Sequence, residues 1–351
     1  MRNIDYEALS NQKWSTDILN LVAKIHEHKG RQDLFVSKKT VELDRLIDIA
    51  RIQSTEASNK IEGIATSNAR VRRLVKEKTT PKNRNENEII GYRDVLNTIH
   101  ESSEYINLKT SYILQFHRDL LKYTDLPYGG KFKIEPNNVT ETKPNGDEVI
   151  RFVPVAPYET KPGIDKICKE YNNAISKGII DPLILIPVFI CDFLCIHPFL
   201  DGNGRMSRLL TLLLLYKSGY NVGKYISIEK QIEETKDEYY DALGNSDDGW
   251  HEEKNDYKPF IKYMLQIILA CYIEFENRVN VVDDDGKKRK AYDIVKEYVE
   301  QKIGKFTSED VEINCPVIGR SSVRSALKKL TEEGMITKHG KGKNTFYVKN
   351  E

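Results

Sequence analysis

Apolar and polar residues follow one another along most of this chain with the three- and four-residue spacing that marks one face of an α-helix. Residues 40–63 are an example, with apolar side chains at Leu43, Leu46, Ile47 and Ala50. The same spacing predicts further helices over residues 12–28, 85–102, 109–122, 162–177, 183–196, 203–218, 229–243 and 257–280. We therefore expect a mainly α fold.

Two regions depart from this pattern. Between Tyr128 and Pro157, the β-favouring stretches 132–134 and 149–153 flank the turn sequence Pro-Asn-Gly-Asp, which predicts a β-hairpin at about 130–155. The basic stretch 70–84 lacks a persistent apolar face. We interpret it as a partly exposed connection whose charges are solvated, in preference to a binding segment for an acidic partner.

The last part of the chain has a pattern of its own. A polar, charge-segregated segment at 281–290 predicts a linker. Beyond it we expect helices at 291–302, at 307–312 and from Ser321 to Gly334, followed by strands at 335–339 and 344–348. Three helices and a β-hairpin are typical of a winged-helix (α+β) domain, here residues 291–351.

The charge of this C-terminal region leaves its partner open. Residues 286–351 hold 15 Lys and Arg against 9 Asp and Glu, a formal charge of +6, and Arg324 and Lys328 lie on the expected third helix. This suits contacts with a DNA backbone. Glu332 and Glu333 interrupt the basic face, however, which keeps protein docking or dimerisation as an equal alternative.

The composition narrows the class of protein. The chain has 351 residues with 39% hydrophobic and 30% charged residues, and 54 basic against 53 acidic residues give a formal charge of +1. This near-neutrality argues against a surface that binds nucleic acid throughout. The five cysteines show no CxxC spacing and predict buried thiols in a reducing compartment.

No membrane segment is expected. The chain opens on polar sequence and not on the apolar run of a signal peptide. The apolar stretch 183–196 is shorter than the roughly 20 residues that a bilayer requires and contains Asp192, and the stretch 209–216 is shorter still. We interpret both stretches as buried core helices and expect a cytoplasmic protein.

Candidate chemistry gathers between these two apolar helices, in the run His-Pro-Phe-Leu-Asp-Gly-Asn-Gly-Arg-Met-Ser-Arg at 197–208. A glycine-rich helix start offers free backbone N–H groups to a phosphate. Arg205 and Arg208 lie three residues apart and can hold further phosphate oxygens. Asp201 can bind magnesium beside the phosphates. His197 is the candidate general base.

This run resembles the signature of the Fic family, HPFx(D/E)GNGRxxR, and matches every specified position. The resemblance extends over roughly residues 30–275. It implies a Fic-type helical core with a β-hairpin flap, and transfer of AMP from ATP to a Ser, Thr or Tyr hydroxyl of a target protein or of the chain itself. The parts would be an N-terminal helical region at 1–105, a catalytic core at 106–280, the linker and the winged-helix domain.

The resemblance also implies a role for each residue of the run. His197 would deprotonate the target hydroxyl, and Asp201 would hold Mg²⁺ (or Mn²⁺). Gly202, Asn203 and Gly204 would form the anion hole, with the Asn203 side chain also contacting phosphate. Arg205 would bind the β-phosphate and Arg208 the γ-phosphate. The flap would hold the target by strand addition.

Two further sets of residues follow from the resemblance. A tyrosine pair helps to form the adenine pocket in related proteins, and the candidates here are Tyr239 and Tyr240, with Leu243. Ser58 to Gly63 resembles the inhibitory motif (S/T)xxxE(G/N), which places the inhibitory helix at about 40–63. Glu62 would pair with Arg208 and keep ATP from binding productively, while Ser58 shares its helical face and Gly63 closes the helix.

Three alternatives stay open at this point. The chain could use UMP or GMP donors, since the signature reads phosphates and not bases. It could remove AMP, with Glu62 orienting a water. It could also be a DNA-binding regulator in which the Fic portion acts as a sensor. The sequence leaves a homodimer open as well.

Overall fold

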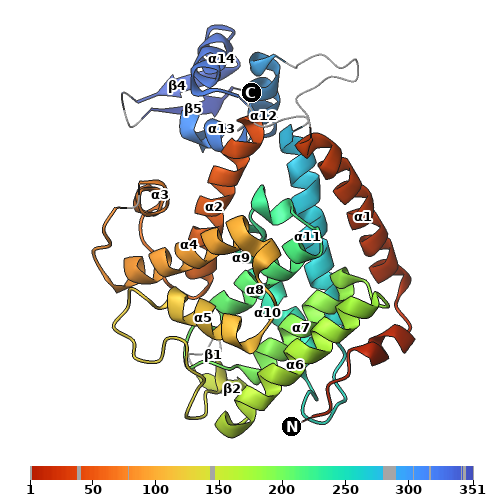
Figure 1. The fold of residues 1–351 in the computed structure, drawn as a ribbon. Helices are drawn as coiled ribbons and strands as arrows, with labels where there is room; N and C mark the ends of the chain where they lie inside the picture. The colour runs from red at the N-terminus through yellow and green to blue at the C-terminus, as the bar shows by residue number, and fades with distance from the viewer. Residues whose placement is uncertain are drawn as a thin grey trace.

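A computed structural model describes residues 2–37, 41–77, 79–142, 147–279, 290–302, 304–315, 318–340, 342 and 345–350 (Figure 1). In chain order, its elements are η1 (Glu7–Asn11), α1 (Thr16–Val36), α2 (Val41–Ile61), α3 (Asn68–Lys76), α4 (Arg84–Ser102), η2 (Ser103–Tyr105), α5 (Thr110–Leu120), β1 (Val139–Thr142), β2 (Glu148–Phe152), α6 (Pro157–Lys177), α7 (Pro182–Ile196), α8 (Asn203–Lys217), η3 (Val222–Lys224), α9 (Ile228–Glu234), α10 (Lys236–Asp247), α11 (Lys258–Val279), α12 (Ala291–Gln301), β3 (Lys305–Phe306), α13 (Ser308–Asn314), α14 (Arg320–Glu332), β4 (Ile336–His339) and β5 (Phe346–Lys349). The mainly α fold expected from the sequence is confirmed.

Helices α7 and α8 form the centre of the larger core. Every residue of α7 from 183 to 196 is buried, and α6, α8, α10 and α11 pack around it. Asp181 caps the start of α7 by accepting from the Leu183 N–H at 2.8 Å, and Pro182 supplies the fixed backbone angle that suits a first helical residue. The two apolar stretches are therefore core helices, as the sequence indicated. Within the described ranges, no helix combines the length and apolar character that a membrane span requires.

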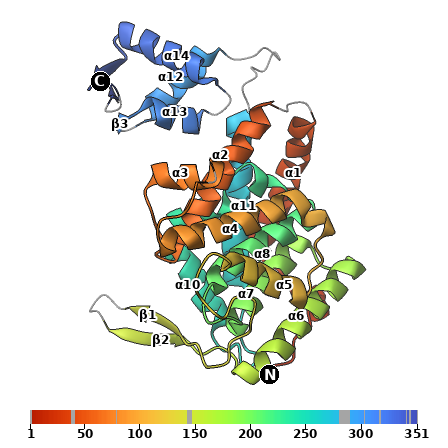
Figure 2. The same cartoon turned by 60° about the vertical axis from the view of Figure 1, so that its left-hand side comes forward.

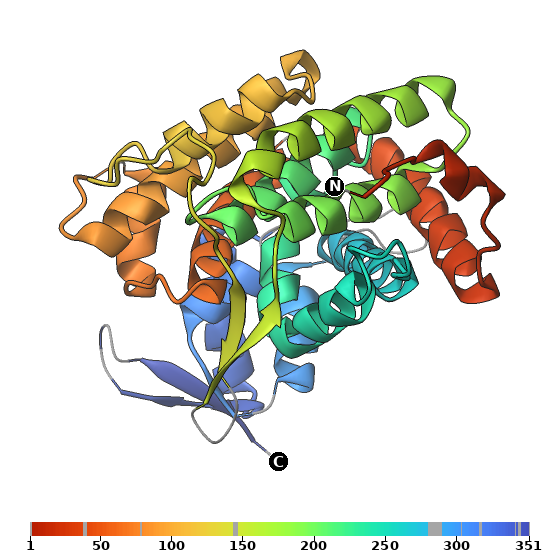
Figure 3. The same cartoon turned by 90° about the horizontal axis from the view of Figure 1, so that it is seen from below.

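The N-terminal residues lie against this centre (Figure 3). The Tyr6 hydroxyl donates to Asp192 Oδ2 at 2.8 Å, and Asp192 Oδ1 accepts from Trp250 Nε1 and the Tyr257 hydroxyl at 2.7 and 2.6 Å. Three donors thus satisfy a carboxylate that lies fully inside the protein. This network explains the one charged residue within the apolar α7.

Helix α2 crosses the body and brings its C-terminal end to the start of α8 (Figure 1). Its sides pack on α4 and α9, and Ser54 Oγ donates to Ser227 Oγ at 2.9 Å. The helix ends at Ile61, and Gly63 then adopts φ +77°, so Gly63 closes it as expected. This arrangement places residues near position 60 beside a loop that lies about 140 positions later in the sequence.

The β-hairpin projects from the helical body as an arm (Figure 2). Its strands β1 and β2 are antiparallel, with Thr140 opposite Ile150. The second strand was predicted correctly, whereas the first lies at 139–142 and not at 132–134. Residues 132–134 instead pass beneath the loop that follows α7, where the Lys133 N–H donates to the Pro198 carbonyl at 2.9 Å. The predicted turn at 144–146 lies outside the described residues.

Two helix predictions were also wrong. The stretch 70–84 is not wholly a connection, because its first part belongs to α3, whose Val71 and Leu74 are buried. The expected helix at 229–243 is two helices, which meet at Thr235 with φ −122° and ψ 41°. The hydroxyl of Thr235 donates to the Gln231 carbonyl at 2.9 Å and so occupies the acceptor at the end of α9.

The C-terminal elements have a separate apolar core around Val295, Val311 and Leu327. They comprise α12, α13, α14 and a three-stranded sheet with the order β3-β5-β4. Strand β3 was not predicted, since it is only two residues long. The predicted linker at 281–290 lies outside the described residues except for Lys290. Arg72 on α3 forms an ion pair with Glu309 on α13, which joins this unit to the larger body.

Candidate active site

The loop between α7 and α8 begins with an unusual backbone angle. His197 has φ 51° and ψ 63°, a left-handed conformation that few non-glycine residues adopt, and this ends α7 as the following proline led us to expect. Its ring Nδ1 lies 3.2 Å from the Leu194 carbonyl. Since a carbonyl can only accept, Nδ1 carries the proton and Nε2 keeps its lone pair.

The protonation state of His197 suits a base. Burial lowers the pKa of His197 to about 4, against the smaller opposing effect of the Leu194 carbonyl. The ring is therefore neutral at physiological pH. A neutral imidazole with a free Nε2 lone pair can accept a proton from a hydroxyl.

The loop is held from within by Asn203 and Phe199. The Asn203 amide accepts from the Phe199 N–H at 2.9 Å and donates to the Phe199 carbonyl at 2.7 Å. The Phe199 ring is buried and stacks on His117 with a centroid distance of 3.7 Å. The side chain of Asn203 thus braces the loop in this structure, a contact that the sequence did not predict.

A second brace comes from the segment before the hairpin. Asn137 Nδ2 donates to the carbonyls of His197 and Phe199 at 3.1 and 2.6 Å. Lys133 Nζ donates to the Ile196 carbonyl at 3.0 Å, and burial lowers the pKa of this lysine to about 8. The sequence analysis missed both residues, because a lysine and an asparagine in a loop carry no pattern that distinguishes them.

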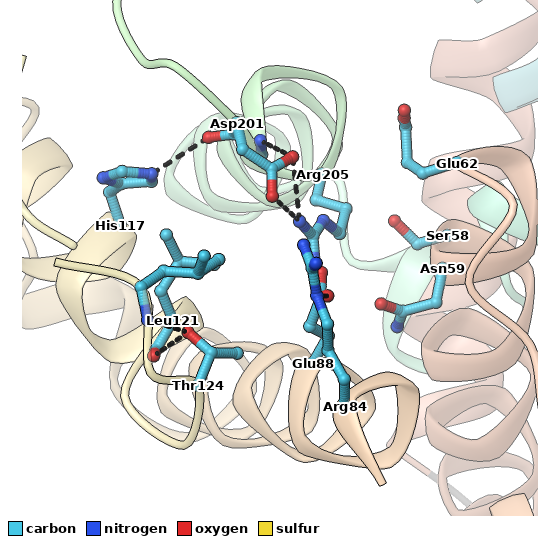
Figure 4. Close-up of polar contacts among 12 residues, drawn as sticks. Ser58, Asn59, Glu62, Arg84, Glu88, His117, Leu121, Thr124, Asp201 and Arg205 are labelled. Carbon is cyan, nitrogen blue, oxygen red and sulfur yellow. Dashed lines mark hydrogen bonds and ion pairs between the residues drawn. The ribbon is translucent and has the colours of Figure 1, made fainter. Parts of the chain in front are cut away.

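His117 fixes the far side of the loop (Figure 4). Its Nδ1 accepts from the Gly130 N–H at 3.0 Å, so Nε2 carries the proton and donates to the Asp201 carbonyl at 3.0 Å. Burial lowers the pKa of His117 to about 4, which keeps this single neutral form. His117 therefore ties the loop after α7 to the segment that precedes the hairpin.

Gly202 and Gly204 make room for a ligand at the start of α8. Gly202 has φ +83°, which favours glycine, and Gly204 lies where a Cβ atom would overlap Glu62 Oε1 and approach Arg208 Nη1 to 3.3 Å. In this structure the carboxylate of Glu62 thus fills the space beside the Gly204 backbone. A phosphate in the same place would meet the helix N-terminus.

Arg208 is held by the end of α2. Its Nε donates to Ser58 Oγ at 2.8 Å, and its Nη2 donates to the Ser58 carbonyl at 2.9 Å and to Glu62 Oε1 at 2.7 Å. The Arg208 side chain is 3% exposed and that of Glu62 is 30% exposed. Burial is the largest single effect on Arg208 and opposes its charge, but the Glu62 carboxylate together with Tyr239 and Tyr92 outweighs it and raises the pKa of the guanidinium.

Asp201 and Arg205 lie together on the other side of the loop (Figure 4). Arg205 is buried, and its Nη2 contacts both oxygens of Asp201 at 3.3 Å. Its Nη1 donates to Glu88 Oε2 at 2.8 Å. The Asp201 side chain is 37% exposed, and its Oδ1 accepts from the Gly202 N–H. Glu88 was not predicted from the sequence, because it belongs to α4 and to no motif.

The surroundings of Asp201 fit a magnesium ion that arrives with a nucleotide. Among the described residues there is no group of three or more His, Cys, Asp or Glu side chains that could hold a metal alone. Magnesium with nucleotides needs only one or two carboxylates, since phosphates and waters complete its octahedron. The carboxylate of Asp201, 37% exposed at the start of α8, could serve as such a ligand.

Helix α10 borders the site through the residues proposed for the base pocket. Tyr239 is 3% exposed and Tyr240 is 36% exposed, with ring centroids 5.3 Å apart, and Leu243 is buried. Burial, followed by the Glu62 carboxylate, raises the pKa of Tyr240. The hairpin reaches this helix as well, because Arg151 Nη2 donates to Asp247 Oδ2 at 2.9 Å.

The loop between α7 and α8 lies within the part of the chain that matches a known protein family. The sequence pattern of the Fic/DOC family matches residues 107–215, which include His117, the hairpin and the whole 197–208 run. Residues 107–215 are thus similar to the Fic/DOC family. The Fic/DOC match does not reach Ser58, Glu62, Glu88 or the tyrosines of α10, so their place in the site rests on the structure.

Similar curated proteins carry related names. The chain is 28% identical over 269 residues to "Protein adenylyltransferase Fic" of Culex quinquefasciatus, which covers 74% of this chain and 49% of that protein. It is 29% identical over 186 residues to "Protein adenylyltransferase fic-1" of Caenorhabditis elegans, over 52% and 32% of the two chains. The chain thus spans about half the length, or less, of the curated relatives it matches.

Solved structures share the fold. A Fic family protein from Desulfovibrio desulfuricans G20 aligns over 97% of both chains with a TM-score of 0.64 and 20% identity. A Fic domain containing signaling protein from Bacteroides thetaiotaomicron VPI-5482 aligns over 74% of this chain and 96% of that chain, with a TM-score of 0.59 and 23% identity. At these identities the likeness establishes the fold alone. It agrees with a helical Fic-type core that carries a hairpin.

Proposed function

We propose that the chain is a protein adenylyltransferase that transfers AMP from ATP to a Ser, Thr or Tyr hydroxyl of a target protein or of itself. The observation that carries the proposal is the neutral His197, with its Nε2 lone pair free to accept a proton, next to a glycine-lined helix start. The names of the similar adenylyltransferases support it.

In this proposal the target hydroxyl gives its proton to His197 Nε2 and its oxygen bonds to the α-phosphorus of ATP. The bond between the α-phosphorus and the bridging oxygen breaks, and pyrophosphate leaves. The backbone at Gly202, Asn203 and Gly204 faces the phosphates and stabilises their negative charge. The loop braces keep His197 in position, so that little reorganisation accompanies the reaction.

Asp201 would hold Mg²⁺ (or Mn²⁺), which supplies charge neutralisation to the phosphates. We assign Arg205 to the β-phosphate and Arg208 to the γ-phosphate. A Cβ at Gly202 would lie 3.7 Å from Arg205 Nη2, so this edge of the guanidinium packs close to the Gly202 backbone. Reaching a phosphate requires that edge to leave its 3.3 Å contacts with Asp201.

Glu62 acts as the inhibitor in this proposal. Its carboxylate occupies the Arg208 Nη2 donor and the space beside Gly204, both of which the γ-phosphate needs. Ser58 supports the same conformation by binding Arg208 twice. Productive ATP binding therefore requires Glu62 to move away.

Tyr239, Tyr240 and Leu243 would border the adenine, and the hairpin would present the target segment by strand addition. The half-exposed Tyr240 supports this assignment, since its ring can offer a face to a base. Tyr239 would act from beneath it, because its ring packs on Phe260 and Tyr263.

Incubation of the chain with ATP and magnesium, followed by mass spectrometry, tests the activity. A gain of one AMP on the chain or on a protein from the same cells is the expected result. A mass gain of one phosphate, or of UMP or GMP from mixed nucleotides in preference to AMP, would contradict the choice of donor and reaction.

We further propose that residues 291–351 form a winged-helix domain beyond a linker at 281–290. The order of α12, α13, α14 and the β4-β5 hairpin supports this, as does the separate apolar core. On α14, Lys328 and Lys329 lie 3.7 and 3.8 Å from Glu332 and Glu333, which weakens the basic face. Binding to duplex DNA that falls steeply with salt would favour a DNA partner, and no binding at low salt would favour protein docking.

The remaining assignments concern the state of the protein in the cell. All five cysteines are buried and unpaired, which supports our proposal of a cytoplasmic location. A homodimer remains a proposal that light scattering would test.

A further inference from the structure

A buried carboxylate on α4 lies behind the candidate active site and belongs to none of the motifs discussed above. Glu88 is 2% exposed, and its two oxygens accept from different arginines (Figure 4). Oε2 accepts from Arg205 Nη1 at 2.8 Å, and Oε1 accepts from Arg84 Nε at 3.0 Å. Four charged side chains are thus linked by ion pairs, in the order Arg84, Glu88, Arg205 and Asp201. Arg84 is exposed, and Asp201 lies at the candidate site.

We propose that Glu88 is a positioning residue that, through Arg205, keeps the carboxylate of Asp201 available to the divalent cation of a bound nucleotide. The inference rests on the proposed function, because it concerns the nucleotide site. It goes beyond that function by assigning a role to a residue outside the Fic/DOC match.

Arg205 is bound more closely by Glu88 than by Asp201. Arg205 is fully buried, and a buried guanidinium requires a counter-charge and hydrogen-bond acceptors. Two carboxylates share this task, but unequally, since Glu88 accepts at 2.8 Å and Asp201 only at 3.3 Å. Glu88 is thus the principal partner of Arg205, and Asp201 is held loosely.

The second step concerns what Asp201 does if Glu88 loses its charge. Arg205 would then have Asp201 as its nearest carboxylate, and the two groups have the fork geometry for a close bidentate pair. Such a pair would engage both oxygens of Asp201 and neutralise its charge. A cation would have to break the pair before it could bind. Glu88 prevents this by keeping Arg205 engaged on its far side.

Glu86, two residues earlier on the same helix, is a matched control. It is 3% exposed, and its oxygens accept from Arg70 Nε and Nη2 at 2.8 and 2.9 Å. Its ion pair therefore resembles that of Glu88 in burial and distance but does not include Arg205. Neutralising either carboxylate perturbs α4 similarly, while only Glu88 has a route to Asp201.

The test measures how much Mn²⁺ tightens the binding of ADP, by calorimetry with and without the metal. All variants carry Glu62→Gly, so that Glu62 does not compete with the phosphates. In Glu88→Gln, which keeps the side-chain shape, the Mn²⁺-dependent gain in ADP affinity should fall by roughly tenfold. Glu86→Gln should keep the gain within about twofold, and Glu88→Asp, which retains the charge, should recover most of it.

Two failures can be told apart. If the Glu62→Gly chain binds no ADP, the proposed nucleotide site is wrong and this role for Glu88 falls with it. If ADP binds and Glu88→Gln keeps the full Mn²⁺ gain, only the role of Glu88 is wrong. An equal loss in Glu86→Gln would also overturn it, by showing a general effect of α4.

A second variant covers the case in which Glu88→Gln does not fold. Arg84→Gln alters an arginine whose side chain is 68% exposed, so folding should be retained. It leaves Glu88 entirely to Arg205 and removes a positive charge near Asp201. The Mn²⁺-dependent gain should then equal or exceed that of the Glu62→Gly chain, and a decrease would contradict the proposal.

Discussion

Replacing Glu62 with glycine should activate the protein and destabilise it at the same time. The contact that is lost joins Arg208 Nη2 to Glu62 Oε1 at 2.7 Å, with Arg208 almost fully buried. Hydrogen bonds to charged groups contribute about 1.5–3 kcal/mol. Since Glu62 is 30% exposed, we take about 2 kcal/mol, which corresponds to roughly a 30-fold rate increase at low ATP.

The cost to stability has the same origin. Without Glu62 the buried guanidinium keeps its two bonds to Ser58 but loses its counter-charge. The free energy of unfolding should therefore fall by about 2 kcal/mol. Position 62 lies beyond the last residue of α2, so the glycine itself does not interrupt the helix.

Transfer of labelled AMP to the chain itself, at ATP well below saturation, is the assay. Glu62→Gln serves as the control, because it keeps the bulk beside Gly204 and removes the charge. Its rate should lie between those of the wild-type and Glu62→Gly chains. Equal rates in the wild-type and Glu62→Gly chains, with both folded, would refute the inhibitory role of Glu62.

Three further predictions concern the loop, the packing beneath it and pH. His197→Ala should abolish transfer in the Glu62→Gly chain and leave ADP affinity within a few-fold, as calorimetry would show; residual transfer near the parent rate would exclude His197 as the base. Gly91→Ala should lower the free energy of unfolding by about 3 kcal/mol in urea titrations, because its Cβ would overlap the backbone carbonyl of Leu120, whereas Gly30→Ala in the open part of α1 should raise it by up to about 1 kcal/mol. Burial lowers the pKa of His117 and His197 to about 4, below the roughly 6.5 of the unfolded chain, so their neutral forms stabilise the fold above about pH 6.5 and this stability is lost as the pH falls toward 4. A melting temperature that stays constant from pH 7 to 4.5 would contradict this assignment.

The sequence identified the parts of the site that lie within single segments. The residue types and spacing of the 197–208 run predict a phosphate site with a base and a metal ligand. The structure places His197, Asp201, the glycines and both arginines around one loop. The pairing of Glu62 with Arg208 was also expected, and its 2.7 Å distance agrees with that interpretation. That expectation depended on a family motif, since spacing alone cannot bring residue 62 to residue 208.

Contacts that depend on tertiary packing were missed. Glu88, Asn137 and Lys133 act on the loop from other segments, and their own neighbours in sequence contain nothing unusual. The misplaced strand at 132–134 has the same cause. Lys133 in this stretch is buried, and its N–H bonds to the Pro198 carbonyl in the loop after α7, so tertiary contacts outweigh a weak local preference.

Glu62 and the γ-phosphate of ATP would occupy the same place, so the inhibition should be competitive with ATP. Glu62 is part of the same chain, so its carboxylate competes for Arg208 as an intramolecular ligand with a fixed effective concentration. ATP can displace such a competitor when its own concentration is high enough. Inhibition by Glu62 should therefore raise the KM for ATP more than it lowers kcat. The protein would then respond in a graded manner to the nucleotide supply of the cell.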